Sequence, residues 1–561
     1  VCEDRRMANP YDVERSWPEY FLEHRRLTVE RQGTYKCGDL PVWTIYCPGG
    51  LLGNSVIIEG DDGLIVYDTG VNLQAGHKIA EEIKKASDKP VKAIFYSHHH
   101  ADHYGGTTAI VDSDDVATGR VDIYAWQNFN PERENEFGEL IARQSMGAGY
   151  YGGALLPPEE RHHHGIGCLP PGGASGFIAP TKQLSEDTTL TIAGVELNVF
   201  YTGGEAISEF GIHLPAFDMV IIADEFFTGL PNLHSIRGSK PRVPDNYLKA
   251  LKRVLDIRPE WLLGTHIIPI QGKDEIADHV TKYSDAIRYL WDQSVRLINK
   301  GYTPVELQHA LKDLPPEVLD PPYTVPVYGT PFTSVPEFFT GWVSWFSGDA
   351  TDLLPSPPGR KATRLVELIG GVDKVLDAAK ADHRAGEHQM AAELAQIALR
   401  ADPGNEDARL VKAAALRARG YQEVNPIARS WYLTGALELE GAIDPAMILE
   451  AFTQMLGGGR SVADIVHSWR YQLDADKAAG KSIVIGVRDT DTGEEVTARV
   501  RRRVLLVEDG IGRDCDAVIE ATAADLTPDG SPRTVSGHQS SWPTLNSLLD
   551  TQPTPFYMHM R

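Results

Sequence analysis

Metal-binding side chains are concentrated in one short segment of this chain, residues 97–103. The segment reads Ser97, His98, His99, His100, Ala101, Asp102 and His103. His98 and His100 are two residues apart, so both imidazoles can point the same way from an extended loop. Asp102 and His103 follow where the loop turns towards a helix. Imidazole and carboxylate groups at this density are suited to zinc or a similar divalent cation, so the segment predicts a metal site.

A buried strand must position this segment. Residues 91–96 are mostly apolar or aromatic and run directly into Ser97. The loop at the carboxyl end of a strand is where α/β sheets bind their ligands. A solvated histidine run or a tag would also explain the composition. Neither is expected between a strand and the glycine pair at 105–106, so the context favours the metal site.

Strands that alternate with helices around this segment indicate an α/β fold. A helix is expected at 77–85, where Ile79 and Ile83 have helical spacing. β-branched and aromatic runs predict strands at 42–46, 55–59, 63–68, 91–96, 189–192, 195–201 and 219–223.

Four residues further along the chain could complete a metal site with two ions. Glu205, Asp224, Glu225 and His266 each follow an apolar, strand-like run. A ligand supplied by the end of a strand is expected in this position. His266 could also be a buried core residue, but the upstream histidine segment favours a ligand.

Composition excludes several classes of function. The chain has 561 residues, with 54 Lys and Arg against 78 Asp and Glu, which gives a net charge of −24. This charge disfavours binding to nucleic acid or to anionic lipid. No apolar stretch approaches the ~18 residues that suggest a membrane span, so stable membrane insertion is not expected. Five cysteines in a chain of this length exclude a disulfide scaffold.

The compartment is left open by the sequence. The chain begins with Val1 rather than Met. A periplasmic or secreted location is expected if a leader was removed, and a cytoplasmic one otherwise.

Pro-rich stretches and shifts in composition predict three domains, at 1–350, 351–440 and 441–561. Pro-rich stretches at 314–336 and 355–358 mark the first boundary. Residues 363–440 are rich in Ala and Leu and resemble stacked helix pairs of the tetratricopeptide type. The last domain combines helices with strands and is expected to be α+β.

The order His-x-His-x-Asp-His at 98–103 resembles the signature of the metallo-β-lactamase superfamily. That resemblance implies an αββα sandwich, in which the first two histidines bind one metal ion and the Asp-His pair binds a second. Asp68, in the Asp-Thr-Gly turn 68–70, resembles the superfamily residue that braces the metal loop from behind. The turn alone is a weak signal.

Further segments resemble the alkylsulfatases related to bacterial dodecyl sulfate hydrolase. Residues 202–209, Thr-Gly-Gly-Glu-Ala-Ile-Ser-Glu, resemble the family's Pro-Gly-Thr-Glu-Ala-Pro-Ala-Glu. Residues 232–238, Asn-Leu-His-Ser-Ile-Arg-Gly, resemble its Asn-Leu-Tyr-Thr-Leu-Arg-Gly. Segments 301–304, 341–345 and 431–436 also resemble the family. The resemblance implies zinc-dependent hydrolysis of alkyl sulfate esters to alcohol and inorganic sulfate, by a hydroxide activated between two metal ions.

The resemblance also assigns roles to residues, with two Zn²⁺ per chain. His98, His100 and Glu205 would hold one ion. Asp102, His103 and His266 would hold the other. Asp224 would bridge the ions, with Glu225 as the alternative. Asn232 and Arg237 would bind the sulfate group, and His234 and Asp102 are further candidate catalytic residues.

Some positions depart from the family pattern. Asp224 stands where Glu is usual, and Ser97 and His99 replace Thr and Ser. Pro231 stands where His commonly precedes the Asn, and His234 stands where Tyr is common. The last two lie beside the expected sulfate site, so they leave the substrate preference and the proton donor open.

The resemblance further implies a homodimer formed by an α-helical dimerisation domain, and a C-terminal sterol-carrier-like domain. The C-terminal domain would gather the alkyl portion of the substrate or only buttress the dimer. Two other functions stay open. One is a different lactamase-fold hydrolase, acting on a phosphoester, lactone or thioester. The other is a lipid-binding protein with an inactive lactamase-like domain. The His162-His163-His164 run is expected to be a loop feature rather than a third metal site.

Overall fold

The computed structural model describes residues 9–136, 139–169, 172–444, 446–447, 461–526, 530–550 and 556–559. They divide into two compact units. The first lies within 1–137, 143–455 and 557–561, and the second within 138–142 and 456–556. The first unit therefore holds residues of both the first and the second expected domain. The boundaries of the three-domain division stay a prediction.

Seven strands form the first sheet, in the order in which they occur in the chain. They are β1 (Gly33–Lys36), β2 (Val42–Tyr46), β3 (Asn54–Glu59), β4 (Leu64–Tyr67), β5 (Val91–Phe95), β6 (Asp122–Trp126) and β7 (Lys182–Leu184). Strands β1 to β4 pair antiparallel, and β4 to β7 pair parallel. The carboxyl end of β5 leads directly into residues 97–103, as the sequence predicts.

Six strands form a second sheet in the order β13-β12-β11-β10-β9-β8. They are β8 (Thr188–Ile192), β9 (Val195–Tyr201), β10 (Phe210–Leu214), β11 (Met219–Ile221), β12 (Trp261–Leu263) and β13 (Ile270–Gln271). Only β11 and β12 pair parallel; the other neighbours are antiparallel.

The two sheets share one apolar core, because alternate residues of each strand face inwards. The shared core includes Val56, Ile58 and Phe95 from the first sheet and Val199, Ile212 and Leu263 from the second. Ile57, between Val56 and Ile58, belongs instead to the cluster on the outer face of the first sheet.

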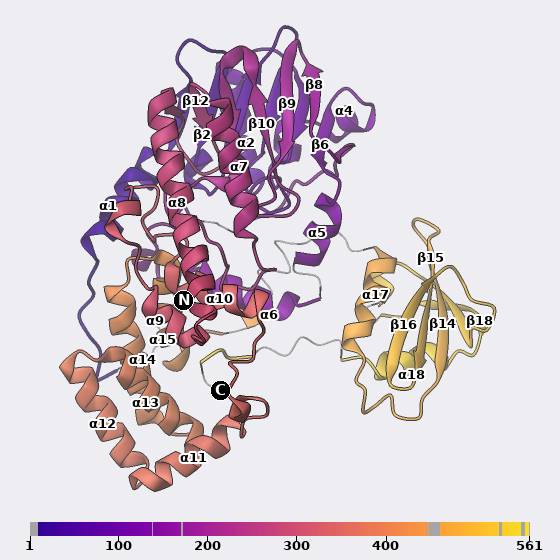
Figure 1. Ribbon diagram of the computed structural model, residues 1–561. Coiled ribbons are helices and arrows are strands. Elements are labelled where there is room, and N and C mark those ends of the chain that lie inside the picture. The colour runs from indigo at the N-terminus through magenta and orange to yellow at the C-terminus, as the bar shows by residue number, and fades with distance from the viewer. Residues whose placement is uncertain are drawn as a thin grey trace. The chain divides into compact units, whose positions relative to one another are not determined.

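Helices cover both outer faces (Figure 1). Helix α2 (Leu73–Ala86) packs on the first sheet through Ile79 and Ile83. Helices α7 (Pro244–Ile257) and α8 (Lys273–Ile298) pack on the second sheet, where Leu251 and Ile287 share a cluster with Leu262. The layers are therefore helix, sheet, sheet and helix, which confirms the predicted αββα sandwich. Smaller helices of this part are α1 (Glu19–Leu27), α3 (Thr107–Ile110), α4 (Ser113–Ala117), α5 (Phe129–Glu136) and α6 (Ile141–Tyr151).

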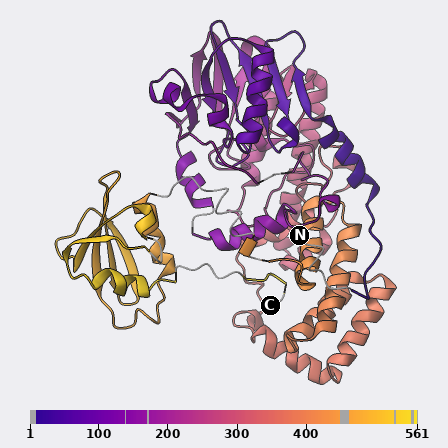
Figure 2. The same cartoon turned by 180° about the vertical axis from the view of Figure 1, so that it is seen from behind.

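A helical segment follows the sandwich in the first unit. It comprises α9 (Pro304–Ala310), α10 (Pro331–Trp342), α11 (Pro358–Ile369), α12 (Val372–Ala385), α13 (His388–Ala401), α14 (Glu406–Gln422) and α15 (Pro426–Leu439). Helices α12 to α15 pack each against the next, so they form the stacked pairs that the sequence predicts (Figure 1 and Figure 2). Helix α14 begins at Asn405, whose side chain accepts a hydrogen bond from the backbone N–H of Ala408 at 2.9 Å.

The second unit contains a five-stranded sheet in the order β16-β15-β14-β17-β18. The strands are β14 (Ile483–Asp489), β15 (Glu495–Arg501), β16 (Val504–Asp509), β17 (Ala517–Ala521) and β18 (Arg533–Gly537). Alternate residues such as Ile485 and Val487 pack with Trp469 of α17 (Val462–Gln472) and Leu545 of α18 (Ser541–Ser547). This unit is therefore the expected α+β sheet domain.

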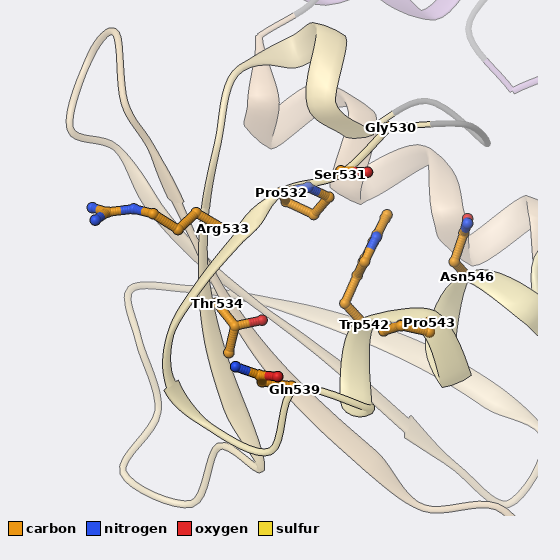
Figure 3. Close-up of a pocket in the computed structure, with 9 residues that line it drawn as sticks. All are labelled: Gly530, Ser531, Pro532, Arg533, Thr534, Gln539, Trp542, Pro543 and Asn546. Atoms are coloured by element: carbon orange, nitrogen blue, oxygen red, sulfur yellow. The ribbon is translucent and has the colours of Figure 1, made fainter.

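A pocket of about 550 Å³ lies in the second unit. In Figure 3 the Trp542 ring rises from α18 towards Ser531 and Pro532, whereas Arg533 points away from the other labelled side chains. The lining combines this apolar ring with hydroxyl and amide side chains, and it comprises Gly530, Ser531, Pro532, Arg533, Thr534, Gln539, Trp542, Pro543 and Asn546. The lining of this pocket is therefore partly polar.

None of the described helices combines the length and apolar character that crossing a bilayer requires.

Candidate metal centre

The ends of four strands converge on one point of the sandwich. Strand β5 supplies the 97–103 loop, and β9 is followed by Glu205. Strand β11 is followed by Asp224, and β12 by His266. These strands belong to two different sheets, so residues up to about 170 positions apart meet because the sheets pack face to face.

The structure brings seven of the predicted ligands together. Three sets of side chains each place one ligand atom per residue within 4.8 Å of the others. The sets are His98, His103 and Asp224; Asp102, His103 and His266; and His100, Glu205 and Asp224.

Asp224 is shared between two of these sets. Its Oδ2 lies 3.2 Å from Nε2 of His266, 3.6 Å from Nε2 of His103 and 3.8 Å from Nε2 of His98. Asp102 completes the group, with its Oδ2 3.3 Å from Nε2 of His266. One carboxylate oxygen thus faces three imidazoles.

Burial shapes the charge state of this cluster. Burial would lower the pKa of His266, but Asp224 and Asp102 outweigh it and raise the pKa to about 9. Burial lowers the pKa of His98 and of His100, and neighbouring imidazoles lower both further. The carboxylates of Asp224 and Asp102 therefore stabilise positive charge at the end of the cluster that holds His266. The end that holds His98 and His100 disfavours it.

The chemistry of the donors fits a metal ion. The Nε2 atoms of His103 and His266 are buried and have no hydrogen-bond partner among the described residues. Both face carboxylate oxygens of Asp102 and Asp224, at 3.2 and 3.3 Å for His266 and at 3.4 and 3.6 Å for His103. A buried polar atom is normally paired, and a divalent cation between these nitrogen and oxygen atoms would pair all of them.

Asp68 positions the metal loop from behind. It follows β4 and has a left-handed backbone, with φ of 63°. Its carboxylate accepts hydrogen bonds from the backbone N–H and the hydroxyl of Ser97, both at 2.7 Å, and lies 2.8 Å from Nδ1 of His103. An N–H at Nδ1 of His103 leaves the lone pair of Nε2 directed at the cluster. The brace implied by the family resemblance is present.

Glu205 is held by residues that the sequence analysis did not identify. Arg242 is buried and forms an ion pair with Oε2 of Glu205. The hydroxyl of Tyr247 donates to the same oxygen at 2.6 Å, and that of Tyr328 donates to Oε1 at 3.1 Å. Burial raises the pKa of Glu205, and Arg242 opposes that rise. No motif surrounds Arg242 in the sequence, so nothing local signalled this role.

Glu209 and Glu225 form a second layer of carboxylates. Glu209 accepts hydrogen bonds from the backbone N–H of Asp224 at 2.7 Å and of Glu205 at 3.1 Å. Glu225 accepts one from the N–H of Gly204 at 2.7 Å, and burial raises its pKa to about 7. The structure therefore places Asp224 among the grouped ligand atoms and Glu225 behind them. Glu209 lies within the family-like segment 202–209, which was the available signal.

The predicted sulfate-binding residues lie in one stretch after η6 (Ala223–Glu225). The side-chain amide of Asn232 donates to the hydroxyl of Tyr151 at 2.9 Å. Arg237 is half-buried. Burial has the largest influence on the pKa of His100 and of Tyr151, and the positive charge of Arg237 lowers the pKa of both. Arg237 therefore acts electrostatically on the metal cluster. Nε2 of His234 lies 3.6 Å from Oε2 of Glu337.

A fourth group of possible ligands combines two residues of α8 with Asp320 from the segment after η7 (Pro316–Val318). Asp278, His279 and Asp320 place ligand atoms within 4.8 Å of one another. Lys282 already provides a cation there, because its Nζ lies 3.6 Å from Asp320 and also contacts Asp278. The group is therefore satisfied as an ion-pair network.

Comparison with known proteins adds family information to this geometry. Residues 48–266 match the family model described as metallo-beta-lactamase superfamily, and residues 303–442 match the model described as alkyl sulfatase dimerisation. A linear primary-alkylsulfatase from Pseudomonas sp. (strain ATCC 19151) is 36% identical over 469 residues, covering 81% of this chain and 88% of the relative. The alkyl/aryl-sulfatase BDS1 of Saccharomyces cerevisiae is 30% identical over 505 residues, covering 87% and 76%.

A solved structure supports the fold. The double mutant of the sec-alkyl sulfatase PisA1 superposes with a TM-score of 0.86 at 24% sequence identity, over 100% of this chain and 94% of that one. At this identity the likeness concerns the fold alone.

The brace at Asp68 yields a testable prediction. Asp68→Ala removes the acceptor for Ser97 and His103, so the metal affinity is expected to fall about 10- to 100-fold. Equilibrium dialysis against a zinc buffer series measures this affinity. The matched control is Asp62→Ala, whose carboxylate is exposed at the surface beside Lys92. Equal zinc affinity in both variants would contradict the role of Asp68.

Proposed function

Because the chain belongs to the alkylsulfatases of the metallo-β-lactamase superfamily, we propose that it hydrolyses alkyl sulfate esters to an alcohol and inorganic sulfate at the cluster around Asp224. One observation carries the proposal most directly. Seven side chains of metal-ligating type meet in one buried group, and Asp224 is common to two of its three sets. An inactive lactamase-like domain would have no need to maintain such a costly arrangement of buried ionisable groups.

We propose two Zn²⁺ per chain. His98, His100 and Glu205 would hold one ion, Asp102, His103 and His266 the other, and Asp224 would bridge them. The observed sets support a shared Asp224, although they also group His98 with His103. When bound, the ions supply a Lewis acid and lower the pKa of a coordinated water from about 15.7 to roughly 7.

The remaining residues hold and orient the substrate in this scheme. Arg237 would bind the anionic sulfate group through paired N–H donors. Asn232, oriented by Tyr151, would add a neutral hydrogen bond. The positive charge of Arg237 would also stabilise negative charge that gathers on the departing sulfate. His234, whose Nε2 lies 3.6 Å from Oε2 of Glu337, is given no role in this scheme.

A screen of sulfate release separates this function from its nearest alternative. The zinc-loaded protein would be given linear, secondary and aryl sulfate esters together with phosphate esters of the same alcohols. Release of inorganic sulfate in preference to phosphate is expected. Turnover of only the phosphate esters, or of a lactone or thioester, would assign the site to another lactamase-fold reaction.

We also propose a homodimer. Large apolar side chains are exposed on α11 and on the segment between α10 and α11, and exposed apolar surface of this kind marks an interaction surface. The exposed fraction is 92% for Leu354, 67% for Leu368 and 66% for Trp345. These residues lie within the stretch that matches the dimerisation model. A second copy of the chain is therefore the proposed partner of this surface.

His100→Ala is expected to abolish sulfate release and to lower the zinc content below two ions per chain. The helical segment should stay folded, because His100 lies on a loop of the sandwich. Elemental analysis and circular dichroism of the same preparation test both statements. Two zinc ions together with full activity would contradict the ligand role.

Arg237→Ala is expected to weaken catalysis with sulfate esters. Loss of a charge-assisted hydrogen bond costs about 1.5–3 kcal/mol, which corresponds to roughly a 10- to 150-fold fall in kcat/KM. Lys240→Ala is the control, since Lys240 lies nearby but pairs with Glu132 at the surface. Unchanged kinetics in Arg237→Ala would place this residue outside the sulfate site.

Leu354→Glu combined with Leu368→Glu is expected to convert the dimer to a monomer. Each change places a charge in the exposed apolar patch, where it would be desolvated by a second copy. Analytical ultracentrifugation at micromolar concentration measures the oligomeric state. Leu140→Glu, at an exposed position outside the helical segment, should leave the dimer intact. A wild-type protein that sediments as a monomer would refute the proposed homodimer.

A further inference from the structure

His164 is a buried imidazole that the proposed reaction does not yet use. It lies in the loop between η4 (Pro158–Glu160) and β7, and only 6% of its surface is exposed. Its Nδ1 has no hydrogen-bond partner among the described residues. Buried polar atoms are usually paired, so an unpaired one at this depth calls for a partner outside the chain.

The neighbours of His164 belong to the candidate site. Its ring centroid lies 5.1 Å from that of Tyr151 and 6.3 Å from that of Tyr328. The hydroxyl of Tyr151 accepts the hydrogen bond from Asn232, and that of Tyr328 donates to Glu205. His164 therefore packs on the two rings whose hydroxyls contact the proposed sulfate-binding and metal-binding residues.

The charged groups that act on His164 are also those of the site. They are Asp102 and His266 of the metal cluster and Arg237 of the proposed sulfate site. Burial is the largest influence and lowers the pKa of His164 to about 4. The ring is therefore neutral near pH 7, with one N–H donor and one bare nitrogen.

The other two histidines of the run point elsewhere. His163 Nε2 lies 3.0 Å from the carbonyl oxygen of Phe21. His162 packs edge-on against Trp17 at 4.2 Å and contacts the carbonyl oxygen of Glu159. Both are engaged with the N-terminal segment and the loop itself, so only His164 is directed towards the site.

The loop holds His164 in a fixed position. The backbone N–H of His164 donates to the carbonyl of Gly167 at 3.1 Å. Gly165 has φ of 92°, and a Cβ at this position would lie 2.2 Å from the carbonyl oxygen of Val327. Close packing of Gly165 on the segment that carries Tyr328 therefore fixes the His164 ring beside the site.

We propose that His164 contacts the substrate and donates a hydrogen bond to an oxygen of the sulfate ester, beside Arg237 and Asn232. This inference rests on the proposed sulfatase function. Sulfate oxygens only accept hydrogen bonds, so a neutral imidazole with one N–H is a suitable partner. The contact would come from the 161–168 loop.

Inorganic sulfate provides a direct probe of this contact. The inhibition constant of sulfate and the KM of a sulfate ester would be measured for the zinc-loaded wild type and for His164→Phe, which keeps a ring against Tyr151 but has no N–H. Both constants are expected to rise about tenfold or more, the size expected for a hydrogen bond to a charged group. Inhibition by the alcohol product and the zinc content should not change. His162→Phe is the matched control and should behave as the wild type.

Two amide variants separate a substrate contact from a packing role. His164→Asn and His164→Gln place an N–H near Nδ1 and Nε2, respectively, so at least one should recover most of the sulfate affinity. If His164→Phe does not fold, the two amide variants test the substrate contact in its place. Unchanged sulfate inhibition in His164→Phe, or equal loss in both amide variants, would overturn the inference while the sulfatase function stands. A wild type that releases no sulfate from any ester would overturn both.

Discussion

The need to keep several ionisable side chains buried around Asp224 governs the rest of this structure. Charges removed from water are costly unless they are paired or bind a metal. Asp224 faces the imidazoles of His98, His103 and His266 at 3.2 to 3.8 Å. Every surrounding element then serves to orient or to neutralise these groups. Asp68 holds the histidine loop, and Arg242 neutralises Glu205.

Much of this site was predictable because its residues follow strands directly. The segment 97–103 has its chemistry within seven consecutive positions, and strand ends explain Glu205, Asp224 and His266. Arg242, Tyr328 and His164 could not be found in this way. Tyr328 meets Glu205 across 123 residues, and the packing of the final fold decides that contact. His234 stays a prediction as a site residue, and its Nε2 lies 3.6 Å from Oε2 of Glu337.

The fold was predictable to a similar degree and for similar reasons. Strands that alternate with helices indicated an α/β fold, and the family resemblance implied the sandwich. The Ala- and Leu-rich composition of residues 363–440 predicted the stacked helices. The sequence could not show how firmly these parts are joined. Arg429 of α15 forms a buried ion pair with Glu160 at 3.2 Å, and Asn425 donates to the carbonyl of Tyr328 at 3.0 Å. The helical segment thereby supports the loop that carries His164 and the segment that carries Tyr328.

The central claim is that two metal ions share Asp224. Anomalous X-ray diffraction from a crystal of the zinc-loaded protein, recorded on both sides of the zinc absorption edge, tests it most directly. The account predicts two anomalous peaks about 3.5–4 Å apart, as in other two-metal sites, one on each side of the Asp224 carboxylate. A single peak, or peaks that lie only at Asp278, His279 and Asp320, would contradict it.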